Sequence, residues 1–252
     1  MSPSRFDKLG PSLQIQLSDW FQRHLGRLLA EQEQRHLEKW VAGLFGYYLI
    51  QVGLPVPDLE LLRGSPVKNK ILLDSRLEGV DLRANPLQIP LATDSVDAVL
   101  MHHALDFSSD PHQLLREVER ILIPEGKLLI VGFNPMSLWG IWRLFHLRGT
   151  QTPWAGHFFS VKRVSDWLSL LGFDLQAVEY LNFRPPLQNQ AIMQRLTFIE
   201  RLGEKNWPVL GGVYVLVAVK RTLTMTPIKP KWAIRKKVLP AAVEPTTRTL
   251  NQ

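Results

Sequence analysis

Two short apolar runs that flank an amphipathic helical pattern constrain this chain more than any other feature. The runs lie at 97–101 and 127–131, and residues 111–122 place their apolar side chains on one face at helical spacing. Asp110 followed by Pro111 is typical of a helix start. A strand, a helix and a strand in this order predict a βαβ unit with parallel strands. Ligands of open α/β sheets bind beyond the carboxyl ends of such strands, so the residues there are candidates for a site.

Similar patterns on both sides extend this unit into a larger α/β domain. Helical spacing over 11–44 predicts one long or two shorter helices, and 160–171 predicts another, with Ser160 as N-cap. The tight turn Pro124-Glu125-Gly126 is expected to lead into the second run of the unit. Further strands are expected at 47–52, 71–74, 80–84, 173–181 and 213–219, and a further helix at 189–202. The last two strands are expected to pair antiparallel and to close the sheet.

The stretch from 89 to 130 resembles the second half of class I S-adenosylmethionine-dependent methyltransferases of the type 11-like kind. It reads IPL at 89–91, DSVDAVL at 94–100 and LLREVERILIPEGKLLI at 114–130. Members of that family commonly read LPF-x-D-x-SFD-x-V and L-x-E-x-x-R-v-L-k-P-G-G-x-l. The sequence pattern LLRE…R-x-LI…G…GFNP resembles, more narrowly, an uncharacterised bacterial branch of this family. The resemblance implies a Rossmann-like α/β fold, a mostly parallel sheet with a C-terminal antiparallel hairpin, S-adenosyl-L-methionine as cofactor and methyl transfer to an unidentified acceptor.

The loop after the first strand departs from the family pattern D-x-G-x-G-x-G. Residues 51–57 read QVGLPVP, so Gly53 is kept, Gln51 replaces the acid, and Pro55 and Pro57 stand at the later glycines. Proline has no backbone N–H. If each lost donor is worth about 1 kcal/mol, cofactor affinity falls by about one to two orders of magnitude. Two functions therefore stay open: an active methyltransferase, or a catalytically inactive protein of this fold that binds a ligand or a protein partner.

A second departure lies between the second and third expected strands. Only residues 75–79 separate the two runs, whereas a parallel crossover needs about a dozen residues or more. We expect an antiparallel hairpin, with 80–84 as the strand parallel to the sheet because it leads into a family-like loop. Asn85 then lies near the adenine; in the opposite arrangement Asp74 binds the ribose hydroxyls. The resemblance implies cofactor-binding residues at Gln51, Gly53, Asp74, Asn85, Pro86, Leu87 and Met101.

His102 and His103 follow the fourth expected strand, where family members place substrate-binding or base residues, and they are the catalytic candidates. Adjacent side chains of a strand point to opposite faces, so at most one of them faces the cleft. His102, His103, Asp106 and His112 match no closed metal-site spacing, and no metal is predicted. The aromatic residues of 139–159 fit either a substrate lid for a planar acceptor or an amphipathic covering helix.

Composition sets further limits on class and partners. The chain has no cysteine, which excludes disulfides and thiolate metal sites, and no apolar stretch long enough to span a bilayer. Of the net charge of +7, residues 226–252 carry +5. We therefore expect a helical extension over 1–36, a methyltransferase-like domain over 37–222 and a basic, Pro-rich, disordered tail over 223–252. A cytoplasmic protein with a small-molecule acceptor is expected, with nucleic acid as a possible partner of the tail.

Overall fold

A seven-stranded sheet forms the centre of the compact unit that ends at residue 222. The structure, a computed structural model, describes residues 15–53, 60–75, 79–145, 153–186, 203 and 207–221. The strands of these residues run β3-β2-β1-β4-β5-β7-β6 across the sheet. Their bounds are β1 Tyr48–Gly53, β2 Asn69–Asp74, β3 Leu82–Arg83, β4 Val96–His102, β5 Leu122–Phe133, β6 Phe173–Leu181 and β7 Val213–Lys220.

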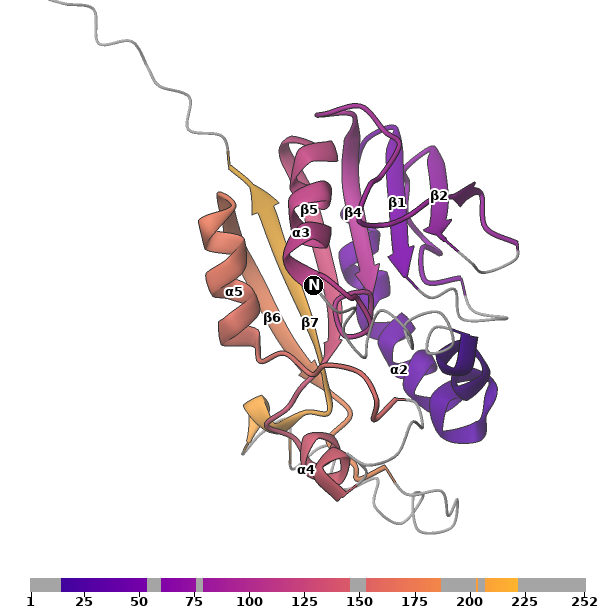
Figure 1. Ribbon diagram of the computed structural model, residues 1–252, viewed down its shortest axis with the longest axis vertical. Helices are drawn as coiled ribbons and strands as arrows, with labels where there is room; N and C mark the ends of the chain where they lie inside the picture. The colour runs from indigo at the N-terminus through magenta and orange to yellow at the C-terminus, as the bar shows by residue number, and fades with distance from the viewer. Residues whose placement is uncertain are drawn as a thin grey trace, which may run out of the picture. The chain divides into compact units, whose positions relative to one another are not determined.

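The directions of the strands confirm a mostly parallel sheet with an antiparallel C-terminal hairpin. Strand β1 pairs in parallel with β2 and β4, and β4 pairs in parallel with β5. Strand β7 lies between β5 and β6 and is antiparallel to both. In Figure 1 the arrows of β1 and β4 point the same way, and the arrow of β7 points the opposite way. The carboxyl ends of β1, β2, β3, β4 and β5 therefore share one edge of the sheet.

The predicted hairpin between the second and third strands is wrong, because β2 and β3 pair in parallel. The link can be short because β3 has two residues and pairs only with Leu73 and Asp74. Between the end of β2 and the start of β3, the chain must return along the strand direction by only about 7 Å, the length of two extended residues. A side chain supplies one of the missing ladder bonds, since the carboxylate of Asp81 accepts the backbone N–H of Leu72 at 2.9 Å.

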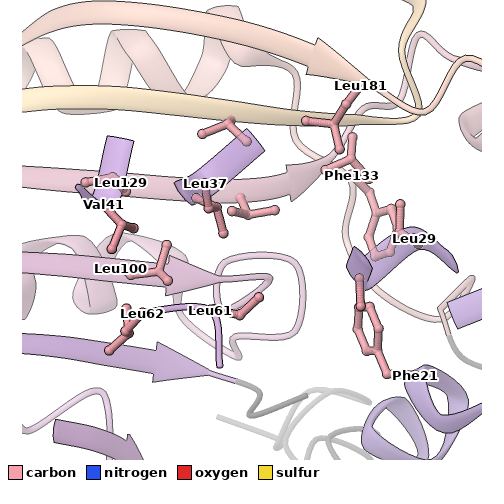
Figure 2. Packing of buried hydrophobic residues seen from close by; sticks show 14 of the residues in the cluster. Phe21, Leu29, Leu37, Val41, Leu61, Leu62, Leu100, Leu129, Phe133 and Leu181 are labelled. Carbon is pink, nitrogen blue, oxygen red and sulfur yellow. The ribbon is translucent and has the colours of Figure 1, made fainter. Parts of the chain in front are cut away.

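The predicted N-terminal helical region consists of two helices, over 15–22 and over His24–Val41 (α2). Helix α2 packs on one face of the sheet. Figure 2 shows Leu37 and Val41 of this helix against Leu100 of β4 and Leu129 of β5. The predicted boundary at residue 36 falls within α2.

The opposite face of the sheet is covered by α3 (Pro111–Ile121) and α5 (Val161–Leu170), which lie on the same side of it in Figure 1. Both predicted N-caps are confirmed: Asp110 accepts the N–H of Gln113 at 2.9 Å, and Ser160 accepts the N–H of Arg163 at 3.4 Å. Their buried residues pack against the alternate side chains of the same strands, such as Val99. Helix α4 (Leu138–Phe145) follows β5, and a 3₁₀ turn covers Pro208–Leu210.

The expected tight turn after α3 is replaced by strand. Strand β5 begins at Leu122, directly after the helix, and its pairing with β4 shifts between Val96 and Ala98. Glu125 adopts φ of 64°, so Pro124-Glu125-Gly126 forms an irregular start of the strand.

The predicted helix at 189–202, Pro55, Pro57 and the tail 223–252 lie outside the described residues. Among the helices that the structure describes, none has the length and apolar character needed to cross a membrane.

Candidate functional site

The end of β1 lies directly against the end of β4. Gly53 pairs with His102 and adopts φ of 100°, which favours glycine. A Cβ at this position would come within 2.4 Å of the carbonyl oxygen of His102. Gly53 is therefore required for this close approach of two backbones. A branched residue here would disturb the sheet as well as any ligand.

Asp74 and Asn85 lie at the same edge because both β2 and β3 are parallel to β1. The N–H of Ala84 donates to the carbonyl oxygen of Asp74 at 3.1 Å, which joins the ends of the two strands. Asp74 is fully buried. Asn85 is exposed, and its side-chain oxygen accepts the N–H of Leu87 at 3.0 Å. The sequence-based choice between these two residues was wrong, because both strands run parallel and place Asp74 and Asn85 at adjacent strand ends. Their contact with a cofactor stays a prediction.

The remaining sequence-predicted cofactor residues lie farther from this edge or beside it. Pro86 and Leu87 are half-buried in the loop that follows β3, where the Leu87 carbonyl accepts Gln113 Nε2 at 3.3 Å. Gln51 is buried within β1, two residues before its end. The side chain of Met101 belongs to the core on the α3 and α5 face. Contact of these residues with a cofactor stays a prediction.

The two histidines after β4 converge on one acid of α2. His102 Nε2 lies 2.9 Å from Oε2 of Glu33, and His103 Nε2 lies 2.9 Å from Oε1 of the same carboxylate. The expectation that the imidazoles point to opposite faces is wrong. His103 adopts a left-handed φ of 50°, which ends the strand alternation and brings the two ring centroids to 4.8 Å.

Asp106 completes this network from the other side of His103. Its Oδ2 lies 2.9 Å from His103 Nδ1 and accepts the N–H of Phe133 at 3.0 Å. Its Oδ1 is buried and has no hydrogen-bond partner among the described residues. We call Glu33, His102, His103 and Asp106 the Glu–His–His–Asp cluster; all four are buried. His112, the other histidine considered, lies elsewhere, with its ring 4.2 Å from that of Trp167.

For Glu33 and His103, attraction to neighbouring charges shifts the pKa more than burial shifts it in the opposite direction. Burial by itself raises the pKa of Glu33, but the adjacent His103 and His102 lower this pKa to about 2. Burial lowers the pKa of His103, but Glu33 and Asp106 raise it to about 9. Burial raises the pKa of Asp106 above its ordinary value. Without any other ion, Glu33 and His103 therefore form a buried ion pair.

Aromatic rings enclose the cluster. The Phe133 ring stacks on His103 at 4.2 Å and on Phe158 at 4.8 Å, and Phe21 lies 5.5 Å from His102. Trp139 is also buried and lies 5.9 Å from Phe133. Of the described aromatic residues of 139–159, Trp139, Trp154 and Phe158 are buried, whereas Trp142 is 37% exposed. The choice between a covering helix and a lid stays open. Phe133 is a core residue.

Glu33 is the member that sequence reasoning missed. It lies four residues after Leu29 and four before Leu37, on the apolar face that α2 buries. An acid at a core position of an amphipathic helix is uncommon unless it is paired. This was the signal in the sequence, but its partners are 69 and 70 residues away and no local pattern identifies them.

Comparisons with known proteins agree with the fold. A family model described as "Methyltransferase domain" matches residues 66–130. The chain is 30% identical over 231 residues to the uncharacterised protein YafS of Escherichia coli K12, covering 91% of this chain and 90% of that protein. It is also 30% identical over 96 residues to a demethylmenaquinone methyltransferase of Chlamydia pneumoniae, covering 38% of this chain and 37% of that protein.

Solved structures show the same fold at lower sequence identity. A protein of Thermotoga maritima described as a SAM-dependent methyltransferase, possible histamine N-methyltransferase, is 18% identical with a TM-score of 0.59. The match covers 81% of this chain and 93% of that one. A SAM-dependent methyltransferase of Mesorhizobium loti is 16% identical with a TM-score of 0.52, covering 73% and 96%.

Proposed function

Because this chain belongs to the class I S-adenosylmethionine-dependent methyltransferases, on the branch that contains YafS, we propose that it transfers a methyl group from S-adenosylmethionine to a small-molecule acceptor. The cofactor binds at the carboxyl edge of β1, β2 and β3. One observation carries this proposal: the parallel directions of these strands bring Gly53, Asp74 and Asn85 to one edge. In open α/β sheets this edge is where nucleotide ligands bind.

The side chains of Asp74 and Asn85 fit an adenosyl group. A carboxylate at the end of β2 accepts hydrogen bonds from the two hydroxyls of a ribose. Asp74 is a fully buried acid at this position. Asn85, one strand farther along, offers amide and carbonyl groups to the edge of a base. These residues are the proposed cofactor contacts on the described part of the edge.

Catalysis in this proposal comes from alignment of the acceptor with the sulfonium methyl group, which needs few dedicated side chains. The two histidines position the end of β4 in this scheme and do not act as general bases. The reason is that both Nε2 atoms already interact with Glu33. This assignment replaces the catalytic role that the sequence suggested for them.

A small molecule is the favoured acceptor because residues 1–225 carry a net charge of only +2. Recognition of a nucleic acid depends on a basic surface that neutralises phosphates. The +5 of residues 226–252 is the remaining feature that favours a polyanion. Deletion of this tail separates the two classes of acceptor, because methylation of a small molecule should survive it.

Calorimetry with S-adenosylmethionine and S-adenosylhomocysteine tests the cofactor proposal. We expect one site per chain, and we expect Asp74→Asn to weaken binding by about tenfold or more, since a hydrogen bond to a charged group is worth about 1.5–3 kcal/mol. The control is Asp166→Asn, an exposed acid of α5. If the wild type shows neither heat nor a thermal shift with millimolar cofactor, the protein is the inactive member of the fold that Pro55 and Pro57 suggest.

A further inference from the structure

The Glu–His–His–Asp cluster has the donor atoms of a metal site. Glu33, His102 and His103 each offer one ligand atom, and these atoms all lie within 4.8 Å of one another. Two imidazole nitrogens with one carboxylate oxygen form a ligand set that zinc and related divalent ions use in proteins. We propose that this cluster binds one divalent transition-metal ion, with zinc as the ion that suits the ligands best.

The distances in the cluster are close to those around a bound ion, although the ligand atoms must still move together. Each histidine Nε2 lies 2.9 Å from its Glu33 oxygen. Ligand atoms about 2.05 Å from a tetrahedral zinc ion lie about 3.3 Å apart. The ion would take the place of the protons between the imidazoles and the carboxylate. Glu33 must move a few tenths of an ångström away from each ring, and the ligand atoms, which lie within 4.8 Å of one another, must come to about 3.3 Å apart.

Asp106 provides a second and independent indication. Histidines that bind a metal commonly donate their other ring N–H to a carboxylate, which fixes the ring and increases its basicity. Asp106 Oδ2 lies 2.9 Å from Nδ1 of His103, the ring nitrogen that faces away from Glu33. Its Oδ1 is buried without a hydrogen-bond partner in the described part of the chain. This carboxylate therefore has the position of an outer-shell residue.

The charges of the cluster also balance with a divalent ion. Glu33 and Asp106 bring two negative charges into a fully buried site, and burial of unbalanced charge is costly. One divalent ion with two neutral imidazoles cancels both charges. Without the ion, two protons must do so. The two states differ in what occupies the space between the rings and Glu33, so they can be distinguished by direct measurement.

The proposed ion would connect three elements at the carboxyl edge of the sheet. Glu33 comes from α2, His102 ends β4, and Asp106 binds the backbone N–H of Phe133 in β5. Binding at this point would fix α2 to the strand ends beside Gly53. This role goes beyond the proposed function, because methyl transfer by alignment of the acceptor needs no metal.

The test begins with removal and return of the ion. Untagged protein is unfolded in denaturant with a chelator and refolded with or without Zn²⁺, because the cluster is closed to solvent in the folded state. We expect one zinc per chain after desalting and a melting temperature several degrees above that of the zinc-free protein. Refolding with Co²⁺ should give visible absorption bands from a site with two imidazole ligands and one carboxylate ligand.

Variants locate the ion. We expect Glu33→Gln to lower zinc affinity at least tenfold and to abolish the cobalt bands, and Asp106→Asn to lower affinity by about 10-fold to 100-fold. The matched control is His36→Asn, because His36 lies on the same helix but is one-third exposed and lies next to Glu179. This variant should bind zinc as the wild type does.

Three results would overturn the proposal. The first is wild-type protein that refolds without bound zinc and without cobalt bands. The second is zinc binding that persists unchanged in Glu33→Gln, and the third is its loss in His36→Asn. If Glu33→Gln does not fold, the stoichiometry and the cobalt spectrum of the wild type decide the question alone.

Discussion

At the scale of single residues, Glu33 is a buried acid whose partners are two adjacent histidines. The left-handed φ of His103 is the local feature that places both rings on the side of α2. A sequence pattern predicts that consecutive strand residues alternate, and it fails here because the strand ends between the two histidines. The presence of two polar residues at a strand end was predictable from the sequence, but their shared orientation was not.

Replacement of Glu33 should strongly lower the stability of the protein when His102 and His103 remain. In metal-free protein, Glu33→Ala removes one of the two buried carboxylates that pair with the cationic His103 and leaves Asp106 as the other. We expect a loss of about 3–5 kcal/mol in the free energy of unfolding. Urea titration in the presence of a chelator measures this loss. Glu31→Ala, which removes an exposed acid of the same helix, serves as the control. A loss below about 1 kcal/mol in Glu33→Ala, the size of an exposed ion pair, would contradict the buried pairing.

At the scale of elements, the helix of the βαβ unit holds the loop that enters β4. Arg120 of α3 donates to the carbonyl oxygens of Ile89 and Leu91, both at 2.8 Å, and Glu117 accepts the N–H of Ile89 at 2.9 Å. The sequence predicted this unit well because its helix and its two strands are local patterns with clear caps. It did not predict the parallel pairing of β2 with β3, because this arrangement depends on a two-residue strand that carries no periodicity.

Loss of this clamp should loosen the loop without unfolding the sheet. Arg120→Met removes the donors to two backbone carbonyls, and we expect a loss of about 1–3 kcal/mol in stability together with faster amide exchange at Ile89. Arg116→Met is the matched control, since Arg116 is exposed on the same helix and bonds to Gln113. Equal exchange at Ile89 in both variants would show that Arg120 does not hold the loop.

At the scale of the whole molecule, the sheet order places strands that are distant in the sequence side by side. Strand β7 lies between β5 and β6, and β1 lies between β2 and β4. The resemblance of 89–130 to a known family predicted the fold class, whereas composition and periodicity alone predicted only an α/β domain. The carboxyl edge joins the ends of five strands, so only the topology shows that Gly53, Asp74 and Asn85 are neighbours.

The basic C-terminal tail gives a prediction that concerns the whole chain. Its composition, rich in proline and lysine without apolar periodicity, indicates a segment that buries little surface. Deletion of 226–252 should therefore leave the melting temperature nearly unchanged. A decrease of several degrees, measured by calorimetry on the full and the shortened chain, would show that the tail packs against the domain.

Hydrogen exchange with and without S-adenosylhomocysteine tests the proposed cofactor site, because it locates the cofactor without any substitution. The account predicts slower exchange in peptides that contain the carboxyl ends of β1, β2 and β3, around Gly53, Asp74 and Asn85. The opposite edge of the sheet, where Asp97 accepts the N–H groups of Tyr47 and Tyr48 at 2.9 Å, should not change. Unchanged exchange at the carboxyl edge in saturating cofactor, or protection confined to the opposite edge, would contradict the proposed site.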